Sequence, residues 1–315
     1  MPDKKTHFKP VYWSILIFII AQCFMFAVAT REEPFLKANN IYLPPQPTQP
    51  IVLLPQPATT SDTGVVTPEV PVPSSLLPIL LYFAGLIVVV GLVLFFIPLS
   101  ALKDLFRVIF ALLFTWGVFI LCVFWLPLWA AIGIALAMGL AWLFFPRVWL
   151  HNLVMIIAVA SVAAVFGRLI SPWTAMILLG ALALYDFFAV RFGYMLWMAN
   201  KMSQTVALPA FILPRHAVEW RSAVTHIDLN KVAGTEPDVR DYSILGGGDI
   251  AFPLLLTASV YFARGLGSSL LIASFALAGL MVAYLIQSVF LKGKPIPALP
   301  PIAVVSLIGL LIVIL

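Results

Sequence analysis

The sequence predicts an all-α integral membrane protein with nine transmembrane helices, the N-terminus inside and the C-terminus outside. Three observations lead to this fold class. Hydrophobic residues make up 63% of the 315 positions and charged residues only 10%. Apolar runs long enough to cross roughly 30 Å of hydrocarbon recur along most of the chain. Lys and Arg fall mostly in alternate connections, which is the bias that sets membrane orientation.

The apolar runs define the expected helices. They cover residues 11–29, 76–99, 108–126, 128–145, 150–170, 172–190, 244–263, 267–291 and 297–315. Pro127, Pro146 and Pro172 mark the short breaks between the third and sixth helices, and such short connections make neighbouring helices antiparallel. An alternative for the first run is a cleaved signal peptide, because lysines precede it and small residues end it.

The chain divides into three parts. Residues 1–190 hold six predicted helices and a proline-rich external loop at 30–75, which we expect to be extended. Residues 191–243 form a charged loop on the cytoplasmic side. An apolar stretch at 205–213 predicts that part of this loop is ordered against the membrane-embedded body. Residues 244–315 hold the last three helices.

The positive charges support this topology. With the N-terminus in the cytoplasm, only four of the 18 Lys and Arg residues fall outside: Arg31, Lys37, Arg168 and Arg264. We expect the last two to snorkel from the ends of their helices. The net charge of +5 has no basic run or face that would favour nucleic acid. The sequence therefore predicts a multi-pass protein of the cell membrane, with the loop at 191–243 cytoplasmic.

Two acidic residues lie within the predicted helices. All of the 13 acidic residues except Asp186 and Asp249 fall in loops or at the N-terminus. An aspartate in hydrocarbon costs several kcal/mol unless it is neutralised, paired or faces a polar cavity. Counted from the outer helix ends, Asp186 is about 21 Å and Asp249 about 22 Å below the same surface. The two carboxyl groups are therefore expected at the same level on neighbouring helices.

Such a pair is suited to hydrolysis. Two adjacent carboxyl groups share a proton and titrate together. One, as base, takes a proton from a bound water while the other, as acid, protonates the scissile carbonyl oxygen. Which aspartate takes which role stays open. Three glycines precede Asp249 and cost stability unless the backbone must approach something closely, for which a substrate backbone is one candidate. Pro253 cannot donate to the Asp249 carbonyl and loosens the helix there.

Three short motifs occur in order along the chain. They are Tyr185 and Asp186 in the sixth predicted helix, Gly246, Gly247, Gly248 and Asp249 at the seventh, and Pro297, Ala298 and Leu299 at the ninth. Together they resemble the YD, GxGD and PAL motifs of the presenilin and signal peptide peptidase family. The resemblance spans the whole chain. The chain is short, and in this it is similar to microbial, archaeal presenilin homologues.

The resemblance implies an intramembrane aspartic endopeptidase of the GxGD type. It implies that Asp186 and Asp249 are catalytic, and that the other motif residues contact the substrate: Tyr185, Gly246, Gly247, Gly248, Pro297, Ala298 and Leu299. Expected partners are transmembrane-helix proteins, the lipid bilayer and a second copy of the chain, with no cofactor, metal or nucleic acid. Gly247 departs from the family, which commonly has a larger residue there, and this bears on cleavage-site preference.

Other interpretations stay open at this point. Paired intramembrane acids also serve proton-coupled transporters and channels. A prepilin-peptidase-like enzyme uses a GxGD aspartate as well. The apolar stretch 205–213 either offers an edge strand to an unwound substrate or lies flat on the membrane surface. His151 and Asn152, at the start of the fifth helix, are expected to be solvated or interfacial.

Overall fold

The computed structural model describes residues 10–41, six positions between 81 and 92, and residues 99–193, 209–224, 242–289 and 297–314. Most of the predicted helix at 76–99 therefore lies outside the described residues. So does most of the predicted loop at 30–75.

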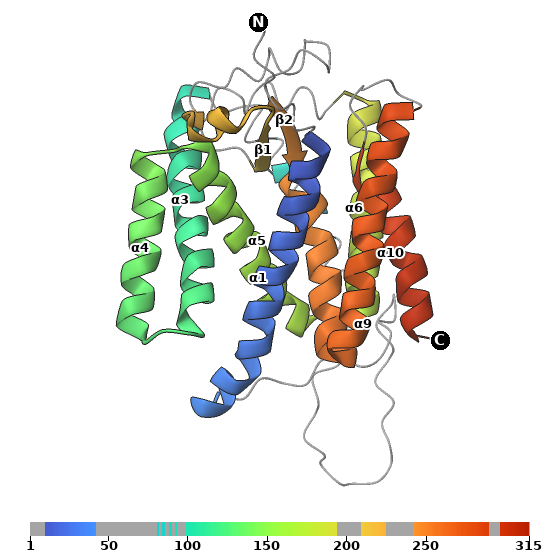
Figure 1. The fold of residues 1–315 in the computed structure, drawn as a ribbon, viewed down its shortest axis with the longest axis horizontal. Helices are drawn as coiled ribbons and strands as arrows, with labels where there is room; N and C mark the ends of the chain where they lie inside the picture. Colours follow the sequence, from blue (N-terminus) through green and yellow to red (C-terminus); the bar gives the residue numbers. More distant parts are fainter. Residues whose placement is uncertain are drawn as a thin grey trace, which may run out of the picture.

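The described residues form a bundle of seven α-helices, one of them divided (Figure 1). They are α1 (Pro10–Ala38), α3 (Leu99–Val123), α4 (Leu128–Phe144), α5 (Val148–Leu169), α6 (Pro172–Arg191), α9 (Gly247–Val289) and α10 (Leu299–Ile314). Helix α5 packs against α1, α3 and α9, while α6 packs chiefly against α9 and α10. Five helices are long and apolar enough to cross a membrane, and α4 and α10 are shorter apolar helices. The protein is therefore a multi-pass membrane protein.

Helix α9 contains a hairpin that replaces two predicted helices. At Gly265 the backbone has φ 82° and ψ −177°, a conformation that glycine adopts readily and other residues do not. The second half folds back along the first (Figure 1), and the Ser269 hydroxyl donates to the Thr257 carbonyl at 2.7 Å. The runs predicted at 244–263 and 267–291 correspond to these two halves.

Two predicted helix ends are wrong. Helix α1 runs to Ala38 rather than to residue 29, and α3 begins at Leu99 rather than at residue 108. Both extensions contain charged residues, which end an apolar run without ending a helix. In α1 the exposed Glu33 pairs with Lys37 one turn later at 2.7 Å. In α3 the Arg107 guanidinium donates to the Leu143 carbonyl of α4.

A two-stranded antiparallel sheet corrects the all-α prediction. Strand β1 (Ala210–Pro214) pairs with β2 (Tyr242–Gly246) in the register Ala210 to Gly246. Residues 244–246, predicted as the start of a helix, are strand, and α9 begins only at Gly247. The stretch predicted to be ordered at 205–213 is a buried strand from Ala210 onward, and residues 205–208 lie outside the described part.

The segment that contains β1 is bonded to the start of α5. After β1 the chain forms a short 3-10 helix, η1 (Ala217–Arg221). The Val148 N–H donates to the Ser222 carbonyl at 3.0 Å, and the Val224 N–H donates to the Pro146 carbonyl at 2.8 Å. The Val148 N–H is one that a helix start leaves unpaired, so this bond satisfies it. The start of α1, the sheet and the end of α5 that holds Val148 lie at one end of the bundle, which we call the sheet end (Figure 1).

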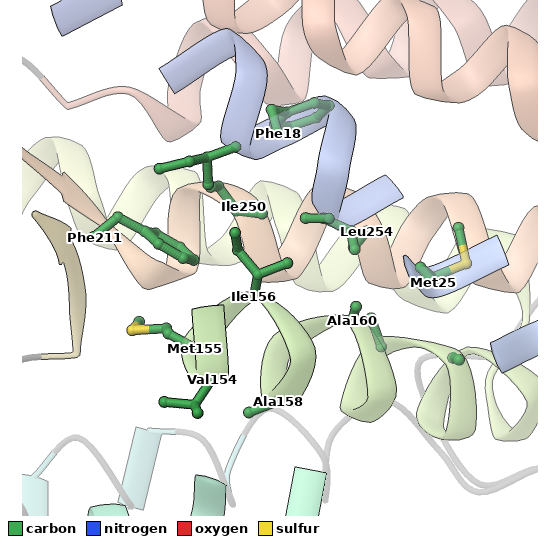
Figure 2. Packing of buried hydrophobic residues seen from close by; sticks show 14 of the residues in the cluster. Phe18, Met25, Val154, Met155, Ile156, Ala158, Ala160, Phe211, Ile250 and Leu254 are labelled. Atoms are coloured by element: carbon green, nitrogen blue, oxygen red, sulfur yellow. The ribbon is translucent and has the colours of Figure 1, made fainter. Parts of the chain in front are cut away.

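The largest group of buried side chains joins α1, α5, β1 and the first half of α9. Figure 2 shows Phe18 and Met25 of α1, Ile156 of α5, Phe211 of β1 and Ile250 of α9 in this group, all of them buried. Helix α1, for which the sequence left a cleaved signal peptide as an alternative, thus packs in the core. Its removal would leave a large cavity.

Candidate active site

The two intramembrane aspartates meet at the sheet end. Asp186 lies in the last third of α6 and Asp249 in the first turn of α9. Both residues are half-buried, and the charge of Asp186 acts on Asp249. The structure thus brings together the two acids that the sequence places at one level. Their position on separate helices allows the distance between them to change when either helix shifts.

Asp249 is held by the residue that ends β2. The Gly246 backbone donates a hydrogen bond to the Asp249 carboxyl group. A Cβ atom on Gly246 would lie 3.0 Å from Oδ2 of Asp249, closer than nearly all real Cβ contacts. Glycine at this position therefore keeps the space that the carboxyl group occupies. Negative charge in the first turn of α9 also suits the positive end of the helix dipole.

Gly247 is required by a contact within the protein. A Cβ atom there would lie 2.4 Å from Cε of Met155 and 2.9 Å from the Pro209 carbonyl oxygen. The Gly247 N–H donates to that same oxygen at 2.9 Å. The prediction of a close backbone approach is confirmed, and the partner is the segment that leads into β1. Gly248 is less restricted, since its nearest neighbour is the Phe252 ring at 3.3 Å.

Asp186 is held by the start of α10. The Leu299 N–H donates to Oδ2 of Asp186 at 3.4 Å. Pro300 and Pro301, which follow, have no N–H, and the Ile302 N–H bonds to the Ala298 carbonyl. The first turn of α10 therefore directs its one available donor at the carboxyl group. This contact joins two of the three motifs identified in the sequence.

The other motif residues lie close to this pair along the chain. Tyr185 precedes Asp186 on α6 and is half-buried. Pro297 and Ala298 precede α10 and are half-buried, with Ala298 packed against the main core. These three residues thus lie close in sequence to either Asp186 itself or Leu299, which donates to Asp186.

The prediction for His151 and Asn152 is wrong, because both side chains are fully buried rather than solvated. Asn152 hydrogen bonds to Ile212 of β1, and His151 to Ala210. The signal in the sequence was two adjacent polar residues at the start of an apolar helix, but the strand that they contact is not evident from the sequence.

Arg168 was also predicted incorrectly. Its side chain is mostly buried, with Nε 3.8 Å from the more deeply buried Glu32 of α1 and the guanidinium over the Phe262 ring. The sequence places Glu32 in a loop, whereas the longer α1 carries it into the bundle. Arg264 instead has an exposed bond to the Val313 carbonyl at the end of α10, as a residue at a helix end would.

Comparison with known proteins shows what the chain is similar to. The family model described as signal-peptide peptidase, presenilin aspartyl protease matches residues 53–315. Two solved structures of a presenilin family intramembrane aspartate protease share the fold. The one in space group C222 has TM-score 0.55 and 17% identity over 96% of each chain. The one in space group P2 has TM-score 0.56 and 18% identity over 95% of each chain.

No curated protein is significantly similar to the chain. The family match nevertheless covers well over half of it, and the shared fold accompanies interacting intramembrane aspartates. The chain belongs to the signal-peptide peptidase and presenilin family of intramembrane aspartyl proteases.

Proposed function

We propose that Asp186 and Asp249 are the catalytic pair with which this protein hydrolyses peptide bonds inside the transmembrane segments of other proteins. The observation that carries the proposal is the electrostatic interaction between two half-buried intramembrane carboxyl groups, each of which accepts a hydrogen bond from a backbone N–H. Isolated acids at this depth would be costly, and their pairing allows one proton to be shared.

The geometry suits a general acid and base acting on one water. The Leu299 N–H occupies Oδ2 of Asp186, so we expect Oδ1 to face the water. The ionised carboxylate takes a proton from that water while the water oxygen attacks the scissile carbonyl carbon. The protonated carboxyl gives its proton to the carbonyl oxygen, which yields a neutral tetrahedral diol. Proton transfer to the amide nitrogen then allows the C–N bond to break.

The sheet supplies a place for the unwound substrate. Asn152 takes both the N–H and the C=O of Ile212, so the outer edge of β1 is closed. Ile244 stands opposite Ile212 in the register, so its own N–H and C=O also point away from the paired strand. Ile244 is exposed and has no hydrogen-bond partner among the described residues. A peptide that added to β2 at this edge would lead directly to Asp249, three residues after the strand ends.

The topology proposed from the sequence is supported by the arrangement of the helix ends. Helix α1 begins at the sheet end and α10 finishes at the opposite end (Figure 1). We therefore place the N-terminus, the 191–243 loop and the catalytic pair toward the cytoplasm, in a nine-helix protein of the cell membrane whose C-terminus is external. The distribution of Lys and Arg supports the same orientation.

The first test is cleavage of a single-span reporter by purified protein in detergent. Asp186→Asn and Asp249→Asn should each lower the rate by more than about 100-fold, because each removes an acid–base group. Glu33→Gln, at an exposed acid in the extension of α1, is the matched control and should cleave normally. Mass spectrometry should place the cut inside the span. Cleavage that persists in either aspartate variant would exclude the pair as catalytic.

The substrate edge has a separate test. Ile244→Pro removes an outward N–H along with the isoleucine side chain and is tolerated at an edge strand, so the fold should persist while reporter cleavage falls about tenfold. Ile244→Val retains the N–H and should behave as the parent. Equal cleavage by the proline and valine variants would show that substrate does not pair with β2.

A further inference from the structure

We propose that His151 and Asn152 of α5 are positioning residues for Asp249. Their side chains hydrogen bond to the outer edge of β1, where a third strand would otherwise pair. They thereby fix the register of the sheet, and that register determines the position of the first turn of α9, which contains Asp249. This inference rests on the proposed catalytic role of Asp249.

Asn152 imitates a neighbouring strand. Its Nδ2 donates to the Ile212 carbonyl at 2.6 Å, and its Oδ1 accepts from the Ile212 N–H at 3.0 Å. A side-chain amide carries the same donor and acceptor as a peptide group, so it satisfies both outward groups of one strand residue. The side chain is only 2% exposed, and water cannot replace these bonds.

His151 fixes a second point on the same strand. Its Nε2 lies 3.0 Å from the Ala210 carbonyl oxygen, and its Nδ1 accepts from Nε1 of Trp142 at 3.2 Å. Because Trp142 can only donate, the imidazole proton is on Nε2 and is donated to Ala210. Trp142 is itself fully buried, so the imidazole ring has little freedom to turn.

Two fixed points define the register. A two-stranded sheet of five-residue strands is weakly specified by its own hydrogen bonds. Adjacent residues of α5 contact Ala210 and Ile212, which point to the same edge of β1. A slip of β1 would put Leu213 or Phe211 against the amide of Asn152, and the residues facing α5 would change.

The register of the sheet determines the position of Asp249 because a few covalent and hydrogen bonds connect β1 to that residue. Ala210 pairs with Gly246, whose backbone bonds to the Asp249 carboxyl group. The Pro209 carbonyl accepts from the Gly247 N–H at 2.9 Å, which fixes the first residue of α9. Displacement of β1 relative to α5 would therefore move the aspartate, while α6 and Asp186 would stay in place.

The test uses the full-length protein and removes the bonds selectively. Asn152→Leu keeps the volume but loses both bonds to Ile212, and His151→Asn is too short to reach Ala210. His151→Gln is the matched rescue, because its amide nitrogen lies where Nε2 of histidine lies. Each variant is assayed for kcat, KM and cleavage position on the reporter, with rates divided by the fraction that binds a hydroxyl-containing peptide inhibitor.

We expect Asn152→Leu and His151→Asn to lower kcat at least about tenfold per active site with little change in KM. Cuts should spread over neighbouring bonds of the reporter. His151→Gln should restore most of kcat and the parental cut. Hydrogen exchange at 209–214 and 242–250 should be faster in the two impaired variants. Should Asn152→Leu fail to fold, the comparison of His151→Asn with His151→Gln tests the inference by the same measurements.

Two results would overturn the inference. One is parental kcat and a parental cut in the variants despite faster exchange in the strands. The other is a lower melting temperature with kcat per active site unchanged, which would make the two residues merely structural. Failure of the proposed function is distinct, because the parent would then not cleave or Asp249→Asn would remain active.

Discussion

The two proposed catalytic aspartates are supported by very different surroundings. Asp249 begins a half-helix that lies among α1, α5 and the sheet, where nearly every neighbour is buried. Asp186 is on α6, which packs chiefly against α9 and α10 at one side of the bundle (Figure 1). Next to it, Leu184, Phe187 and Phe188 are exposed. One acid is thus fixed by the core, and the other is carried by a helix that packs against fewer of the described elements.

The largest expected difference in stability and cleavage is between alanine substitutions at two glycines, one from each region. Gly247→Ala places a methyl group against Met155 and the Pro209 carbonyl, so we expect a loss of about 2 kcal/mol in stability and cleavage reduced well over tenfold. Gly180→Ala on α6 meets nothing within 4 Å and should raise stability by up to about 1 kcal/mol. Thermal unfolding and reporter cleavage measure both. Similar results for the two variants would show that the regions do not differ in packing.

An intermediate effect is expected at the contact that holds Asp186. Leu299→Pro removes the N–H that donates to Oδ2, and proline is tolerated as the first residue of a helix. Losing a hydrogen bond to a charged group costs about 1.5 kcal/mol, so kcat should fall about tenfold. Leu299→Ala keeps the N–H and loses only the side chain. If the alanine variant is as slow as the proline variant, packing rather than the N–H positions Asp186.

The smallest effect on cleavage is expected far from the acids. Arg168→Met leaves Glu32 buried without its cation, which should cost about 2 kcal/mol of stability. Cleavage by the folded fraction should change less than about twofold, because neither side chain contacts the proposed site. A double-mutant cycle with Glu32→Leu isolates the pair. A large change in cut position would show that the α1–α5 contact also controls the site.

The sequence predicted the two intramembrane acids and most helix positions because the membrane constrains both. Hydrocarbon selects apolar runs of known length, and it makes Asp186 and Asp249 anomalous. The ends of α1 and α3 were missed for the same reason, since Arg31 and Arg107 limit the apolar runs and not the helices.

The sheet was harder to foresee. Strand β1 finds one partner in β2, far along the chain, and another in the side chains of His151 and Asn152. Such long-range pairing has no local sequence pattern. The glycines before Asp249 did indicate a close approach, but the residues that approach Gly247, Met155 and Pro209, cannot be identified without the fold.

The pairing of β1 with β2 also bears on how the chain is held together. Residues up to Val224 are bonded to α5, and residues from Tyr242 onward are bonded to β1. The position of Asp249 thus depends on noncovalent contacts on both sides of residues 225–241, and not on the peptide bonds between them. Two separately produced fragments divided within that stretch should reassemble into one bundle, with each fragment contributing one of the two acids.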